Sequence, residues 1–165
     1  MDASHALFER LVAEHERDVL RVARAIVRDA HLGADVAQEA FLRLWRALQA
    51  SAPPARPGAW LRTATISAAL DAERREQARP RSELSAEPAS ASAGDPAAEA
   101  ELARRYERAL ATLSEGQRTV FLLKHESGLS LAEVAEALHL ALPTVKTQFA
   151  RACSKLQQGL RPFRS

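Results

Sequence analysis

The stretch that decides the fold is residues 128–149, GLSLAEVAEALHLALPTVKTQF. Ser130 stands three residues before Glu133, which is the spacing of a capping box and predicts a short helix over residues 131–138. After a turn of three residues, a longer helix is expected over residues 142–158. A short capped helix, a tight turn and a longer basic helix are the pattern of a helix-turn-helix.

The longer helix separates an apolar face from a polar one. Val145, Phe149, Ala152 and Leu156 recur at helical spacing and are expected to face a core. The side chains that then face outward are Thr144, Lys146, Thr147, Gln148, Arg151 and Lys155. Such a face can reach base edges in the major groove, because Arg pairs with guanine and Gln with adenine, while the helix N-terminus suits a phosphate.

The charge of the chain also points to a polyanion. From Ala137 to the end there are five basic residues and no acidic one, although the net charge of the whole chain is only +2. A basic segment of this kind is the electrostatic footprint of a nucleic acid partner. On periodicity alone, the alternative is an ordinary helical hairpin with a solvated basic face.

Upstream of the helix-turn-helix, Ser114 and Gln117 repeat the capping-box spacing and predict a helix through about Glu126. Another apolar face precedes it between Leu102 and Leu113. Together these segments form a second module, residues 101–165.

Residues 77–100 separate the second module from the first. They are rich in Pro, Ser and Ala, and Leu84 is the only large apolar side chain among them. Such a segment cannot bury enough surface to offset the entropy of ordering itself. We therefore expect a flexible linker, open to proteases, between two modules that tumble semi-independently.

The first module, residues 1–76, is expected to form three helices with one small core. An apolar face runs from Leu7 to Ile26, a second follows a break at Gly33, and a third begins at Trp60 after a Pro-rich loop over residues 51–58. The large aromatics Phe41, Trp45 and Trp60 are interpreted as core residues, since aromatics at helical spacing usually are.

Composition excludes several classes of protein. Ala occupies 35 positions while Gly and Pro together occupy 14, which favours helix and predicts an all-α fold. No apolar run approaches the roughly 20 residues of a membrane span, and the N-terminus lacks the pattern of a secretory signal. A single cysteine, Cys153, excludes an internal disulfide, and the sequence holds no metal, cofactor or catalytic motif. We expect a cytoplasmic protein that is not an enzyme.

Several further stretches carry a family resemblance. Residues 113–118 (LSEGQR), 128–135 (GLSLAEVA) and 144–147 (TVKT) resemble region 4 of the extracytoplasmic-function (ECF) sigma factors of bacterial RNA polymerase. Residues 35–45 (DVAQEAFLRLW) resemble the polymerase-binding helix of region 2 in the same family. The resemblance covers nearly the whole chain, with two modules in the family's order.

The resemblance implies a role for particular residues. Asp35, Gln38 and Glu39 would dock on the clamp helices of the polymerase β′ subunit, with the β subunit as a further contact. The −10 promoter element would meet Arg62, Ser67, Arg74 and Arg75, of which Ser67 stands where many members have Asn. Arg118 would join the −35 contacts of the outward face. The partners implied are core RNA polymerase, promoter DNA and an anti-sigma factor.

Two alternative interpretations concern proteins without a polymerase partner. A helix-turn-helix regulator would bind duplex DNA alone, but this leaves residues 35–45 unexplained. A helical antagonist of a DNA-binding protein would show no salt-dependent DNA affinity in its second module, whereas a sigma factor would.

Overall fold

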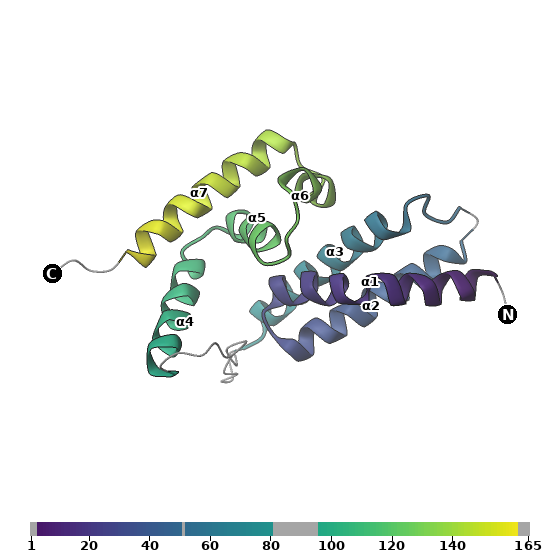
Figure 1. The fold of residues 1–165 in the computed structure, drawn as a ribbon, viewed down its shortest axis with the longest axis horizontal. Coiled ribbons are helices and arrows are strands. Elements are labelled where there is room, and N and C mark those ends of the chain that lie inside the picture. The colour runs from purple at the N-terminus through teal and green to yellow at the C-terminus, as the bar shows by residue number, and fades with distance from the viewer. Residues whose placement is uncertain (1–2, 51, 81–95, 162–165) are drawn as a thin grey trace.

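The computed structural model describes residues 3–50, 52–80 and 96–161, and these residues form seven helices without a strand (Figure 1). The all-α fold class is confirmed. The helices are α1 (Ala3–Val27), α2 (Ala30–Leu48), α3 (Pro57–Ala78), α4 (Pro96–Ala111), α5 (Glu115–His125), α6 (Leu131–Leu138) and α7 (Leu142–Leu160). Residues 81–95, most of the expected linker, lie outside the described residues.

The first module is a bundle of α1, α2 and α3. Its own core is a cluster of buried apolar side chains from all three helices, centred on Leu44 and Leu61, which are almost fully buried. The three aromatics that were expected in the core, Phe41, Trp45 and Trp60, are half-buried. Phe41 and Trp60 pack against the rim of this cluster, and Trp45 packs edge-on against Phe8.

The break between α1 and α2 lies at Arg28 and Asp29, so the expected break at Gly33 is wrong. Arg28 adopts a left-handed φ of 54°, and the Asp29 carboxylate accepts a hydrogen bond from the Leu32 amide at 2.7 Å, capping α2. Gly33 is buried inside α2, where a Cβ would stand 2.7 Å from Cγ of Arg24. This glycine is needed for the close approach of α2 to α1 rather than for a turn.

The third helix begins a turn earlier than expected. Pro57 and Gly58, assigned from sequence to a loop, lie in the first turn of α3. Proline is favoured there because its fixed φ suits a helix and its missing N–H would have no partner within the helix. Residue 51 of that loop lies outside the described residues.

Both capping boxes are confirmed. The Ser114 hydroxyl accepts from the Gln117 amide while the Gln117 side chain accepts from the Ser114 amide, and Ser130 and Glu133 repeat the arrangement. These boxes fix where α5 and α6 begin, and Gly128 at φ 70° turns the chain between them. The entry into the helix-turn-helix is therefore set by local sequence.

His139 ends α6 in the left-handed conformation, with φ 55° and ψ 41°. The Leu140 amide donates to the Ala135 carbonyl at 3.0 Å, which is the closing bond of a Schellman-type cap. Glycine adopts this conformation without the steric cost that a Cβ brings.

We therefore expect His139→Gly to raise the free energy of unfolding by about 0.5–1 kcal/mol, measured by urea denaturation. His139→Ala, which keeps the Cβ, is the control and should give no such gain. Equal stability of the two variants would show that the backbone at this position is not strained.

The two modules pack against each other, contrary to the expectation of independent tumbling. One continuous core cluster joins apolar side chains of both modules: Val22, Ile26, Ile66 and Ala69 of the first, and Val120, Leu123, Val134 and Val145 of the second. Helix α5 contacts α1, and α6 contacts α3, as Figure 1 shows. The linker's composition gives no information about these apolar side chains, because they lie outside it.

Candidate nucleic-acid interface

Helix α7 presents the polar face expected of a recognition helix. Val145, Ala152 and Leu156 are buried, while Thr144, Lys146, Thr147, Arg151 and Lys155 are exposed. Among the described residues, no side chain caps the N-terminus of α7, so its first amides are available, as a phosphate-binding helix end requires. This arrangement can place basic and polar side chains in a major groove.

Two side chains of this face are less available for contacts with DNA than expected. Gln148 is half-buried beside Gly116, and within the described structure its Oε1 is buried without a hydrogen-bond partner. The Thr147 hydroxyl donates to the Pro143 carbonyl at 3.0 Å within the helix. Lys146, Arg151 and Lys155 are thus the readily available donors of α7.

Arg118 does not join the α7 face. It lies half-buried on α5 and pairs with Glu73 of α3 in the first module. Its guanidinium is held at the contact between the modules.

Helix α3 carries the residues expected to meet −10 DNA, and two of them are paired with the second module. Arg62 Nη1 lies 3.0 Å from Glu133 Oε1, and Arg74 Nη2 lies 3.2 Å from Glu115 Oε1. The hydrogen bond from the Ser130 amide lowers the pKa of Glu133, and Arg62 lowers it further, so Glu133 is ionised near neutral pH.

The other two members of the −10 set lie apart from each other. Ser67 is exposed and lines a cleft between α3 and the end of α6, shared with Arg74 and His139. Arg75 donates to the Asp71 carbonyl at 3.2 Å and contributes to the positive field around Glu39 of α2. Ser67 and Arg74 thus share a cleft to which Arg75 does not belong.

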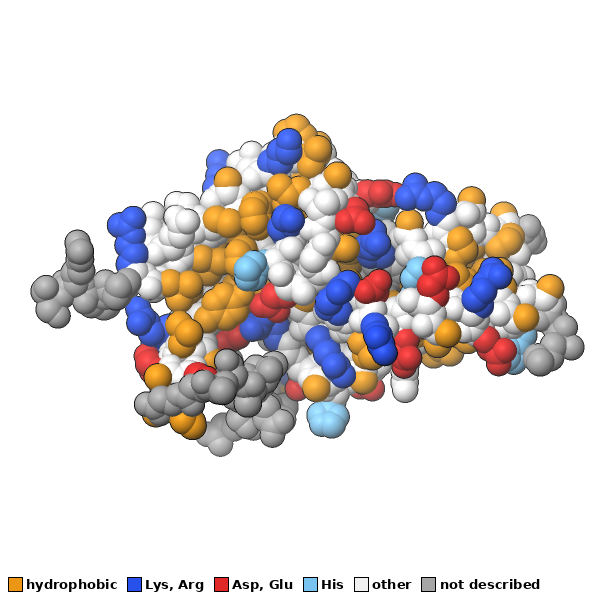
Figure 2. Space-filling model, viewed as in Figure 1, with side chains coloured by type: hydrophobic (Ala, Val, Ile, Leu, Met, Phe, Trp, Pro, Cys, Tyr) orange, Lys and Arg blue, Asp and Glu red, His pale blue; other side chains and the backbone are white. Residues whose placement is uncertain are grey.

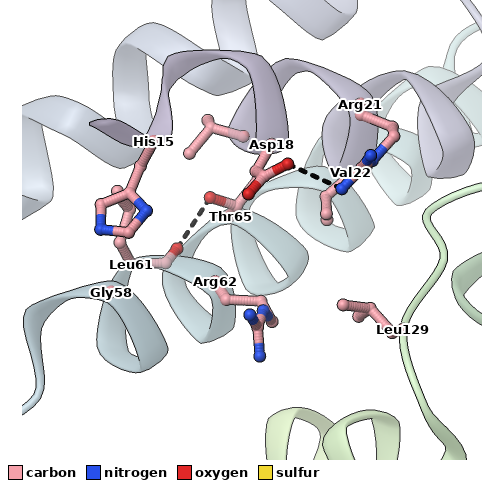
Figure 3. Close-up of a pocket in the computed structure, with 10 residues that line it drawn as sticks. His15, Asp18, Arg21, Val22, Gly58, Leu61, Arg62, Thr65 and Leu129 are labelled. Atoms are coloured by element: carbon pink, nitrogen blue, oxygen red, sulfur yellow. Dashed lines mark hydrogen bonds and ion pairs between the residues drawn. The ribbon is translucent and has the colours of Figure 1, made fainter. Parts of the chain in front are cut away.

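A second cleft lies where α1 and the first turns of α3 meet the second module (Figure 3). His15, Arg21, Gly58 and Arg62 line it from the first module, and Leu129 lines it from the second. Arg62 points from α3 toward the second module. The segment that leads into α6 therefore borders this cleft through Leu129.

The expected polymerase-docking residues share a solvent-facing stripe on α2. Asp35 and Gln38 are exposed, and Glu39 is partly exposed with its carboxylate 2.8 Å from Nε of Arg43. The hydrogen bond from Arg43 lowers the pKa of Glu39, so this carboxylate is ionised. Sequence reasoning missed Leu42, which lies 50% exposed on the same stripe, four residues after Gln38.

Sequence reasoning also missed the role of the acidic residues of the second module. Residues 102–165 contain five glutamates and no aspartate, and each glutamate pairs with an arginine of the first module. We call this set the acidic face: Glu107, Glu115, Glu126, Glu133 and Glu136. A sequence signal existed, since these five are the only acids of residues 102–165, which are otherwise basic, but nothing indicated their partners.

Arg28 of the first module pairs with two glutamates of the acidic face. Its Nη1 lies 2.8 Å from Glu126 Oε1, it also pairs with Glu107, and its guanidinium lies 5.7 Å from the centre of the Tyr106 ring. Burial opposes the charge of Arg28, but the hydrogen bonds to both glutamates outweigh it and raise the pKa. Burial and Glu126, which accepts from the Tyr106 hydroxyl, raise the pKa of Tyr106.

Comparison with known proteins agrees with this geometry over both modules. The family model described as Sigma-70 region 2 matches residues 11–79, and the model described as Sigma-70, region 4 matches residues 103–156. The ECF RNA polymerase sigma factor SigM of Mycobacterium tuberculosis is 32% identical over 93% of this chain and 76% of its own length. The chain belongs to the ECF sigma factors.

The share of a relative's length that this sigma factor covers varies from one relative to another. The probable RNA polymerase sigma factor RfaY of Xanthomonas campestris is 34% identical over 93% of this chain, which spans only 40% of RfaY. The solved structure of CnrH in complex with the cytosolic domain of CnrY is 28% identical, with a TM-score of 0.65 over 93% of this chain and 87% of that one.

The fold of this sigma factor is also found at lower identity. RpoE of Bartonella quintana, solved in complex with the anti-sigma factor NepR, has a TM-score of 0.68 at 20% identity, covering 95% of this chain and 98% of that one. As a sigma factor, the chain acts in the promoter-directed initiation of transcription. In the part of the chain that the structure describes, no helix is long and apolar enough to cross a membrane.

Proposed function

We propose that this sigma factor binds core RNA polymerase through the exposed stripe of α2, reads −35 duplex with α7 and meets −10 DNA along α3. The observation that carries this proposal is the presence of both surfaces on one chain. A recognition helix with free basic side chains alone would fit any helix-turn-helix regulator. The stripe of Asp35, Gln38, Glu39 and Leu42 on α2 has no function in such a regulator.

We further propose that residues 1–76 form the polymerase and −10 module and residues 101–165 the −35 module, with residues 77–100 between them. The ends of this expected linker are helical, since residues 77–78 belong to α3 and residues 96–100 to α4. The chain itself makes and breaks no bonds, since the polymerase performs the chemistry. It works in the cytoplasm, where its polymerase and promoters are.

An anti-sigma factor is the proposed regulator. Support comes from CnrH, which was solved in complex with the cytosolic domain of CnrY and whose likeness extends over both modules of this chain. A regulator that contacts both modules would cover polymerase-facing and DNA-facing surfaces together.

Run-off transcription on a library of promoters tests the function as a whole. Core polymerase with this chain should give defined transcripts that core polymerase alone does not. If the chain binds duplex DNA but never directs a transcript or associates with core polymerase, the interpretation as a regulator replaces that as a sigma factor.

The docking stripe is tested by Gln38→Ala with Glu39→Ala. We expect the Kd for core polymerase to rise about three- to thirty-fold, because a charged and a polar group would leave the interface. Circular dichroism should be unchanged, since both side chains are at least partly exposed. Glu16→Ala with Gln77→Ala, exposed on α1 and α3, is the matched control and should bind as the wild type. Equal affinity for all three proteins would remove the docking assignment.

A further inference from the structure

The second module divides its charge between two surfaces. All five acidic residues of residues 102–165 pair with arginines of the first module, whereas the basic side chains of α7 remain exposed. Figure 2 shows acidic and basic side chains meeting along the middle of the molecule, where the modules join. A charge distribution of this kind gives a module one surface that attracts arginines and another that attracts phosphates.

Two of the arginines that pair with the acidic face are also among the residues assigned to −10 DNA. Arg62 and Arg74 belong to that set, and Arg56 lies just before α3, with its Nη2 3.5 Å from Glu136 Oε1. A carboxylate and a phosphate use the same N–H donors of a guanidinium. These arginines cannot be paired fully with both at once.

Apolar contacts hold the acidic face in place. Leu129 lines the cleft at the start of α3, and Ala137 and Leu138 of α6 line the other cleft together with Ile66 and Leu70 of α3. The ion pairs are thus the outer part of a contact whose centre is the shared core cluster. The closed arrangement has both a hydrophobic and an electrostatic contribution.

We propose that the acidic face is an internal substitute for the phosphates of −10 DNA, so that the free chain is closed and masks its own −10 surface. The proposal rests on the proposed function, because it takes α3 as the −10 surface. In the closed chain the α7 face stays open, so masking affects the −10 element and leaves −35 duplex accessible. When the chain docks on polymerase, the two modules separate, and the arginines leave their glutamate partners and become available to DNA.

The test neutralises two members of the acidic face, with Glu115→Gln and Glu133→Gln in one chain. A glutamine at position 133 can still accept the Ser130 amide and complete the capping box, so the variant is expected to fold. Glu99→Gln with Glu101→Gln is the matched control, since it removes the same charge from α4, where the structure pairs Glu101 with Arg104 and Arg108 of its own helix.

The first readout is binding of a fluorescent single strand that carries the −10 sequence of a promoter found in the run-off library. Loss of two partly exposed ion pairs should shift the equilibrium between the closed and the open chain by roughly five- to twenty-fold in total. The acidic-face variant should therefore bind the −10 strand about that much more tightly than the wild type does. The control should gain only the small increase that added positive charge gives. Affinity for −35 duplex should change equally in both variants.

The second readout is energy transfer between dyes on Gln49→Cys and Gln158→Cys, both exposed positions, in a Cys153→Ala background. Transfer should be high in the free wild type, lower in the acidic-face variant and lower again on core polymerase. Modules that are already apart in the free wild type, or an acidic-face variant that binds −10 strand no better than the control, would overturn the proposal. If the library yields no promoter, the proposed function fails, while the dye measurement still decides whether these two glutamates hold the chain closed.

Discussion

Truncation of Leu44 to alanine is expected to lower the free energy of unfolding by about 2–5 kcal/mol, the range for large-to-small changes at buried leucines. Leu44 has no exposed surface and lies at the centre of the first module's own core cluster. Neighbouring helices can relax only partly into the space, so the loss of contacts adds to the loss of burial. Urea denaturation followed by circular dichroism measures the change.

Leu42→Ala is the matched comparison, because it makes the same chemical change two residues away on the same helix. Leu42 is 50% exposed, so its truncation should change the free energy of unfolding by less than about 0.5 kcal/mol. It should instead weaken binding to core polymerase several-fold, since the side chain lies on the docking stripe. A similar loss of stability in both variants, or wild-type polymerase affinity in Leu42→Ala, would contradict the orientation assigned to α2.

The second large effect is expected at the recognition helix. Arg151→Ala should cost roughly 1–3 kcal/mol of −35 binding at one base pair, if the guanidinium reads a base there. Arg151 is exposed on α7 and forms no ion pair with the residues that the structure describes, so folding should be unaffected. Competition among −35 duplexes that vary one base pair at a time measures the effect.

Arg104→Ala is the control for Arg151→Ala, because it removes the same charge from an exposed position on α4. It should leave both affinity and base preference unchanged. If Arg151→Ala instead weakens binding to every duplex equally and flattens the salt dependence, Arg151 is a phosphate contact and other residues of α7 read the bases.

Local signals in the sequence were sufficient for the second module. The capping boxes at Ser114 and Ser130 each involve residues three apart, so the starts of α5 and α6 could be predicted without knowledge of the rest of the fold. The buried positions of α7 followed from a helical period in the same way. Such features depend on neighbours in sequence, which is why they were predictable.

Features that depend on distant residues were not predictable. Gly33 was interpreted as a break because the sequence does not show that the Arg24 side chain lies beside it. That contact exists only when α1 and α2 pack against each other. Likewise, Arg62 and Arg118 were assigned to promoter DNA without knowledge of their partners Glu133 and Glu73, which are 71 and 45 positions away in the chain. The sequence therefore predicted the helices that carry the candidate site, while the electrostatic partners of its residues came only from the fold.

The position of the acidic face late in the chain has a consequence during synthesis. A ribosome adds about 5–20 residues per second, so α6 emerges several seconds after α3 is complete. Until then the arginines of α3 and the apolar side chains beside them, Ile66 among them, have no partner from the second module. The nascent first module is thus uncovered until α6 has left the ribosome.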